Sequence, residues 1–170
     1  TDKIIAVPKG TGQYRWMMMN IGKVKIRGVD FNGQARFTLP CDVEADINLS
    51  YTFQKAQDYS DPSDNDPEAG TYKGQISYIP WHNGSVVGHL TWRKVELNYS
   101  FIYVGERYNQ QENILYNHTQ PWYTHDLSLV GEWDIHKAKG KRLFTLRAAL
   151  DVNNLLSQDY DVILNYPMPK

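Results

Sequence analysis

The sequence predicts an all-β fold, an antiparallel up-and-down meander of about seven long strands that forms part of a transmembrane β-barrel. Three observations lead to this fold class. Apolar and polar residues alternate with period two in several long runs. Short and long links alternate between these runs. Aromatic residues, which make up 13% of the chain, gather near the ends of the runs.

The clearest alternation is the eleven-residue run from Glu44 to Gln54, about twice the mean strand length. Its apolar positions are Ala45, Ile47, Leu49, Tyr51 and Phe53. Further strands are expected at 85–92, 95–103, 126–133, 144–152 and 23–39. In the last of these the apolar phase changes after Gly28, which predicts a β-bulge there.

The links between the runs differ systematically in length. Tight links are expected at 39–42 and 93–94, a short-to-medium link at 135–141, long polar links at 55–77 and 109–120, and another loop at 155–160. Outer-membrane barrels combine short periplasmic turns with longer extracellular loops, as this pattern does. A strand of about twelve residues tilted by ~45° spans about 28 Å, which matches an apolar band of about 25 Å.

Composition excludes several other classes. The 170 residues carry a net charge of −1, so no basic field indicates a nucleic-acid partner. Cys41 is the only cysteine, which excludes an intrachain disulfide. No apolar stretch is long enough for a transmembrane helix. The first residues lack the features of a signal peptide, so we expect a cytosolic chain, a processed chain or one that begins mid-structure.

The aromatic residues near strand ends suit a membrane–water interface, where rings with one polar end are enriched. They are Tyr14, Trp16, Trp81, Trp92, Trp122, Tyr123 and Trp133.

Five ordered segments resemble TonB-dependent outer-membrane receptors, most closely those of Bacteroidetes type. Residues 13–30, QYRWMMMNIGKVKIRGVD, are similar to that family's "N-(hydrophobic)-G-K-x-x-I-x-G-(V/I)-(D/E)" strand. The others are IPWHNGS at 79–85, YVGERY at 103–108, the VNNL…QDY stretch at 152–160 and NYPMP at 165–169. They follow the family's order along nearly the whole chain.

The resemblance implies an active-transport receptor for a scarce, bulky nutrient (cobalamin, haem or an iron–siderophore complex), energised through TonB and not enzymatic. It implies the outer membrane of a Gram-negative bacterium, with the long loops extracellular. The expected partners are outer-membrane lipid, the rest of the barrel and its plug, the inner-membrane TonB complex and the small-molecule substrate. Residues 1–170 are expected to be a C-terminal fragment of one barrel domain, without the plug and the final strand. No cofactor, metal or catalytic residue is expected.

Aromatic side chains in or beside the long links are the candidate substrate contacts, because they can stack on a corrin, porphyrin or catecholate ring. They are Tyr108, Tyr116, His118, Trp122 and Tyr160. Under the resemblance, His118 is the candidate ligand for a haem-like substrate. The pairs His82/His89 and His118/His125 are each seven residues apart, a spacing that on one strand gives opposite faces and no metal site.

Two other functions remain open from sequence. One is a self-contained eight-strand barrel that binds a small apolar ligand, as lipocalins do; Gly131 and Trp133 form a G-x-W triplet. The other is a small outer-membrane anchor or enzyme barrel, for which the adjacent His125 and Asp126 suggest acid–base work.

An acidic segment lies in the first long link. It contains Asp58, Asp61, Asp64, Asp66 and Glu68 without the spacing of an EF-hand. We expect a solvated loop, with a weak cation site as the alternative.

Overall fold

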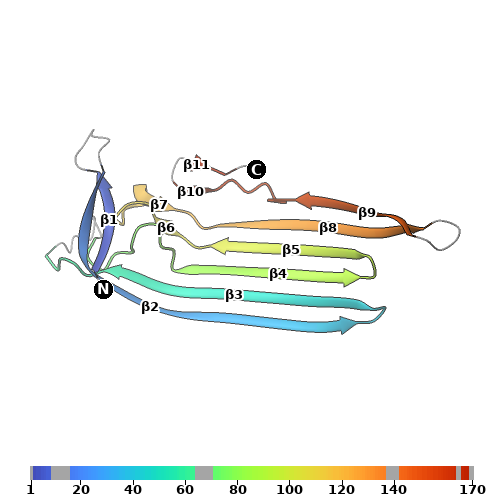
Figure 1. The fold of residues 1–170 in the computed structure, drawn as a ribbon. Helices are drawn as coiled ribbons and strands as arrows, with labels where there is room; N and C mark the ends of the chain where they lie inside the picture. Colours follow the sequence, from blue (N-terminus) through green and yellow to red (C-terminus); the bar gives the residue numbers. More distant parts are fainter. Residues whose placement is uncertain (1, 9–15, 64–70, 137–141, 164–165, 169–170) are drawn as a thin grey trace. The chain divides into compact units, whose positions relative to one another are not determined.

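The computed structural model describes residues 2–8, 16–63, 71–136, 142–163 and 166–168. Seven strands form one antiparallel sheet in the order β1-β2-β3-β4-β5-β8-β9 (Figure 1). They are β1 (Asp2–Pro8), β2 (Trp16–Leu39), β3 (Val43–Asp58), β4 (His82–Trp92), β5 (Val95–Val104), β8 (Trp122–His136) and β9 (Arg142–Val152). The predicted all-β meander of long strands is confirmed.

Shorter elements lie in the links between these strands and after β9. Strands β6 (Arg107–Tyr108) and β7 (His118–Thr119) pair with each other, as do β10 (Asp161–Ile163) and β11 (Tyr166–Pro167). The 3-10 helix η1 spans Leu115–Asn117. Over the described ranges, no helix is long and apolar enough to cross a membrane.

The chain divides into two compact units. The loop unit comprises Thr1–Val29, Phe53–His82 and Gly105–Pro121, and it contains two of the long links. The sheet unit comprises Asp30–Thr52, Asn83–Val104 and Trp122–Lys170. Strands β2 and β3 contribute residues to both units.

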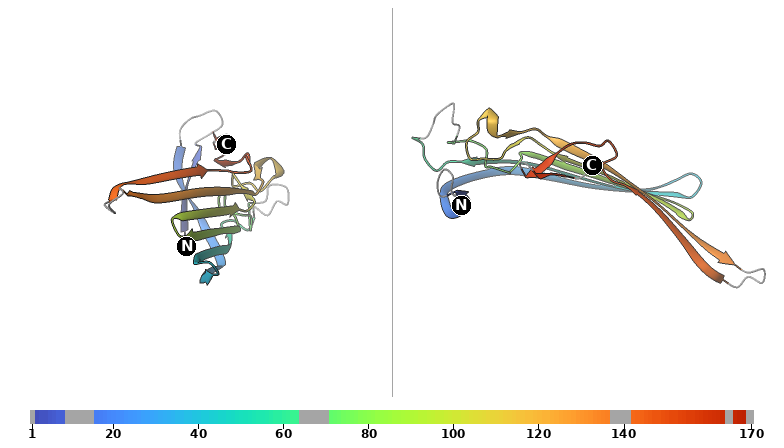
Figure 2. Two further views of the ribbon diagram at one scale, coloured as in Figure 1. Left: turned by 90° about the vertical axis from the view of Figure 1, so that its right-hand side faces the viewer. Right: turned by 90° about the horizontal axis from the view of Figure 1, so that it is seen from above.

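In the sheet unit, strands β4, β5, β8 and β9 lie side by side in one layer (Figure 2). All ten residues of β5 have a partner in β4 and another in β8, from Val95 to Val104. This unshifted register places Leu90, Leu97 and Leu129 on one face and His89, Asn98 and Ser128 on the other.

The apolar face of the sheet unit is exposed. Leu129 retains 42% of its accessible surface, Leu146 50% and Leu150 62%. Apolar patches of this extent are rare on water-soluble monomers and indicate contact with lipid or another apolar surface.

The tight turns lie where the sequence predicts them. Cys41 and Asp42 have φ values of 68° and 59° between β2 and β3, and Arg93 has φ 55° between β4 and β5. These left-handed conformations reverse the chain within a few residues. The aromatic prediction also holds at the strand ends, since Trp16 begins β2 and Trp122 begins β8; Tyr14 lies outside the described residues.

Several boundaries differ from the prediction. The sequence does not predict strand β1, and β3 continues to Asp58, whereas the sequence predicts a link from Lys55 onward. The link at 109–120 is not irregular throughout, because η1 and β7 lie within it. Strand β7 has only two residues and depends on its pairing with β6, so local periodicity does not reveal it.

Gly28 lies within β2, which continues through it, and the β-bulge there stays a prediction. A Cβ atom at Gly28 would lie 2.5 Å from the carbonyl oxygen of Phe53. The close approach of two backbones therefore requires glycine at this position.

Replacing Gly28 by alanine should destabilise the protein by about 1–3 kcal/mol, because the new methyl group forces two strands apart. Gly88→Ala is the matched control, since a Cβ at Gly88 meets no atom within 4 Å. Urea unfolding of the purified protein in detergent, followed by tryptophan fluorescence, measures both. Equal midpoints for the two variants would contradict the close approach.

Candidate functional site

A small apolar core holds the loop unit together. Val24 of β2, Ala56 of β3 and Ile76 of the following link are buried against one another, and Ile79 packs on them. Around this core lie polar side chains that are also buried. They are Asp58, Gln75, Arg107, Asn109 and Asn117. Buried polar groups require hydrogen-bond partners, so this unit depends on specific polar contacts more than on apolar area.

Gln75 and Asn113 connect the two long links of this unit. The Gln75 backbone N–H donates to Asn113 Oδ1 (2.6 Å), and Asn113 Nδ2 donates back to the Gln75 carbonyl (3.0 Å). The Gln75 side chain also donates to the carbonyls of Ile79 (2.7 Å) and Glu106 (3.3 Å). Gln75 therefore ties the link after β3 to the link after β5.

Two of the predicted substrate contacts meet in the β6–β7 pair. Tyr108 is opposite His118 in the register, and the two rings meet edge-to-face at 5.4 Å and 70°. His118 Nε2 lies 3.3 Å from the Glu106 carboxylate, and Nδ1 lies 3.5 Å from Gln120 Nε2. Only 16% of the His118 side chain is exposed. Coordination of a haem iron by His118 would have to displace one of these neighbours.

Two other predicted contacts meet in the sheet unit. Trp122 and Tyr160 stack with ring centroids 4.3 Å apart and planes at 25°. The link that carries Tyr160 is held to β8, because Asn154 N–H donates to Asp126 (2.7 Å) and Leu155 N–H to the His125 carbonyl (2.7 Å). Each ring thus already covers one face of the other, so a substrate can stack on the outer faces alone.

Tyr116 is separate from both pairs. It lies in η1 with 89% of its surface exposed, as does its neighbour Leu115.

The two histidine pairs with a spacing of seven residues do not both lie on a single strand, as the sequence argument assumes. His118 and His125 lie on different strands, β7 and β8, so strand alternation does not relate them. His125 accepts or donates a hydrogen bond with the Tyr99 hydroxyl (2.6 Å), whereas Asp126 bonds Asn154. The suggested acid–base pair His125–Asp126 is therefore divided between the two faces of β8.

The acidic segment is not solvated throughout. Asp58 is buried, and it accepts hydrogen bonds from the backbone N–H and hydroxyl of Ser60. The expectation is wrong for Asp58 because β3 extends to include it. Asp61 is exposed, and the Ser63 hydroxyl and N–H that donate to it hold the pKa of its carboxyl below the usual value. Asp64, Asp66 and Glu68 lie outside the described residues.

The loop unit contains a pocket of about 260 Å³ between its two long links. Its lining residues are Lys73, Gly74, Gln75, Trp81, His82, Glu106, Tyr108 and Asn113. Of these, Tyr108 alone is a predicted substrate contact. Sequence reasoning missed the others, although the aromatic dipeptide Trp81-His82 at the start of β4 was a signal.

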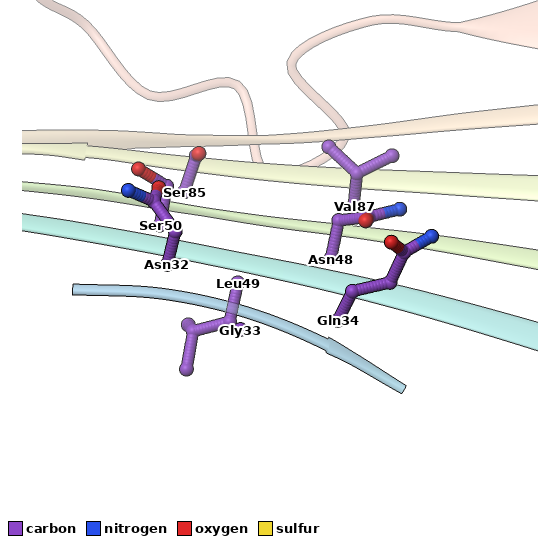
Figure 3. A pocket seen from close by; sticks show the side chains of 8 residues that line it. All are labelled: Asn32, Gly33, Gln34, Asn48, Leu49, Ser50, Ser85 and Val87. Atoms are coloured by element: carbon purple, nitrogen blue, oxygen red, sulfur yellow. The ribbon is translucent and has the colours of Figure 1, made fainter. Parts of the chain in front are cut away.

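The polar face of the sheet unit holds a second pocket of about 300 Å³. Its lining residues are Asn32, Gly33, Gln34, Asn48, Leu49, Ser50, Ser85 and Val87. In Figure 3 the side chains of Ser50, Ser85 and Asn48 rise from this face, while Leu49 points to the opposite side. The lining carries hydroxyl and amide groups and no charged side chain.

Asp46 fixes one end of this pocket. Its carboxylate accepts from Arg36 Nε (3.0 Å), Gln34 Nε2 (3.2 Å) and Asn48 Nδ2 (2.6 Å). Because both amide nitrogens donate to Asp46, this carboxylate fixes the orientation of the two amide groups.

No group of three histidine, cysteine or acidic residues in the described part of the chain is placed to hold a metal ion.

A family model described as "TonB dependent receptor-like, beta-barrel" matches residues 1–155. A search of curated proteins finds no significant match.

Truncating Asn113 to alanine should loosen the loop unit. It leaves the buried N–H and carbonyl of Gln75 without partners, at a cost of about 1–3 kcal/mol for each group. Hydrogen exchange of residues 71–82 should therefore accelerate. Asn153→Ala is the control, because Asn153 is exposed. Unchanged exchange at 71–82 in Asn113→Ala would show that the tie between the links is dispensable.

Proposed function

This chain belongs to the TonB-dependent receptor β-barrel family, and we propose that it forms part of the wall of a barrel that imports a scarce, bulky nutrient. The family consists of outer-membrane transporters and receptors, not enzymes. The observation that carries the proposal is the sheet unit, whose apolar face is exposed while its opposite face carries hydroxyl, amide and charged groups.

Lipid accounts for the apolar face. Leu129, Leu146 and Leu150 are all exposed, and hydrocarbon would cover them without a second protein layer. The alternative of a self-contained lipocalin-like barrel would turn these residues inward to a ligand cavity. The family membership favours the lipid-facing arrangement.

The polar face would line the interior of the barrel and face the plug. Its carboxylates in the sheet unit are Asp30, Glu44, Asp46, Glu96, Asp126, Glu132, Asp134 and Asp151. Among the described side chains, two arginines oppose them on this face: Arg36 is bonded to Asp46, and Arg147 is paired in register with Glu132. A surface with this excess of negative charge complements a plug surface that carries lysine and arginine.

The long links would lie outside the cell and receive the substrate. Tyr108, His118, Trp122 and Tyr160 sit at the ends of long strands or in the links, and Tyr116 projects from η1. Aromatic faces suit the flat rings of haem, the corrin of cobalamin or the catechols of an iron–siderophore complex. Release into the periplasm would require the plug and the energy of the TonB complex.

The orientation can be tested with the one native cysteine. Cys41 is exposed in the tight turn between β2 and β3 and should face the periplasm. A membrane-impermeant maleimide should therefore label it in permeabilised cells and not in intact cells. In a Cys41→Ser background, Leu115→Cys should be labelled in intact cells, because Leu115 is 89% exposed in a long link. The reverse pattern would contradict the orientation.

Substrate uptake tests the transport function. Cells that express the protein should accumulate one of labelled cobalamin, haem or a ferric siderophore, and only when TonB is functional. Tyr116→Ala should weaken uptake at limiting substrate by about 3–10-fold if Tyr116 stacks on it. Because Tyr116 is 89% exposed, its truncation should leave the unfolding midpoint unchanged. Uptake of all three substrates that is independent of TonB would refute the proposal.

A further inference from the structure

We propose that the pocket of the loop unit is a binding site for a small planar carboxylate, such as an aryl or heteroaryl acid. The pocket lies between the two long links, with Lys73 and Trp81 from the first and Glu106 and Tyr108 from the second. The assignment rests on the proposed function only in taking the long links as the part of the protein that meets solutes. The chemistry of the lining residues carries the choice of ligand.

Hydrogen-bond donors without a carboxylate or carbonyl partner among the described residues lie on the pocket lining, at Lys73 and Trp81, and beside it, at Lys55. Trp81 Nε1 is buried and has no hydrogen-bond partner among the described residues. The Lys73 ammonium lies 5.1 Å from the Tyr72 ring centroid, and the Lys55 ammonium lies 4.8 Å from that of Trp81. In the described part of the chain neither lysine forms an ion pair with a carboxylate. An anionic acceptor would satisfy these donors.

Two of the acceptors that line the pocket, Asn113 Oδ1 and the Glu106 carboxylate, already have partners. Asn113 Oδ1 accepts the Gln75 N–H, and its amide nitrogen donates to the carbonyls of Gln75 and Gln111. The Glu106 carboxylate faces His118 Nε2 at 3.3 Å, and its side chain is 68% exposed, so water screens its charge. The pocket therefore has donors to offer, and an anion fits it better than a cation does.

The walls favour a flat ligand. Trp81, His82 and Tyr108 all line the pocket, and the His82 ring is itself packed on Phe53 with centroids 5.1 Å apart. A volume of about 260 Å³ lies just below the usual range for small-molecule pockets, which suits one aromatic ring with a carboxylate.

The backbone of the first link is held in a strained form beside these groups. Lys73 and Tyr78 have φ values of 62° and 60°, which residues with side chains rarely adopt. Hydrogen bonds from Lys73 N–H to the Asp58 carbonyl (2.6 Å) and from Tyr78 N–H to the Tyr108 carbonyl (2.7 Å) maintain them. Such strain collects at binding sites, where it fixes side chains in place before the ligand arrives.

Calorimetric titration of the purified intact protein in detergent tests the site, with benzoate as the probe and benzamide as its neutral isostere. We expect benzoate to bind about tenfold more tightly than benzamide, because only benzoate forms charge-assisted hydrogen bonds. Lys73→Met should remove this preference. Trp81→Phe keeps an aromatic ring, although a smaller one, and removes the indole N–H; it should weaken benzoate binding by about 3–10-fold.

The matched control is Lys94→Met, which removes an exposed lysine of the β4–β5 turn and should leave binding unchanged. Circular dichroism confirms that each variant is folded. Equal affinity for both probes, no detectable benzoate binding to the native protein, or a preference that survives Lys73→Met would overturn the assignment. This readout is independent of uptake in cells, so its failure and that of the transport proposal are distinguishable.

Discussion

The hydrogen bonding of the backbone is the constraint on which the structure depends. In hydrocarbon, every N–H and C=O without a partner costs several kcal/mol, so a spanning strand must be paired along both of its edges. Strand β5 meets this requirement fully, because each of its ten residues has a partner in β4 and another in β8. Because the backbone groups pair within the sheet, only the side chains meet the surroundings, and successive side chains point to opposite faces. The sheet unit can therefore be apolar on one face and polar on the other.

The loop unit meets a different requirement. Its links do not form long runs of strand-to-strand backbone hydrogen bonds. Side chains therefore form the hydrogen bonds to many of their backbone groups. Gln75, Asn113 and Asn117 each bond to backbone carbonyls or N–H groups of the links. This network holds aromatic and cationic groups around a pocket in a unit whose apolar core is small. Recognition and transport would thus be divided between a polar, hydrogen-bonded unit and a lipid-facing sheet.

Much of the sheet could be predicted from sequence, because period two is a local signal. The run at 44–54 and the turns at 39–42 and 93–94 correspond to observed elements. The site could be predicted far less well. The tie between Gln75 and Asn113 joins residues 38 positions apart, and the stack of Trp122 on Tyr160 joins the start of β8 to the link after β9. Neither contact produces a periodic pattern in the sequence. The burial of Asp58 cannot be predicted unless the full length of β3 is known.

The most direct test of the account is a scan of spin labels along β8, at each position from Asp126 to Trp133, in the protein reconstituted into lipid. Collision rates with oxygen, which partitions into hydrocarbon, and with a water-soluble nickel complex report the surroundings of each label. The account predicts alternation with period two, in which Leu127, Leu129 and Trp133 favour oxygen and Asp126, Ser128 and Glu132 favour nickel. Equal accessibility to both reagents on the two faces, or the opposite phase, would contradict a wall between lipid and a wet interior.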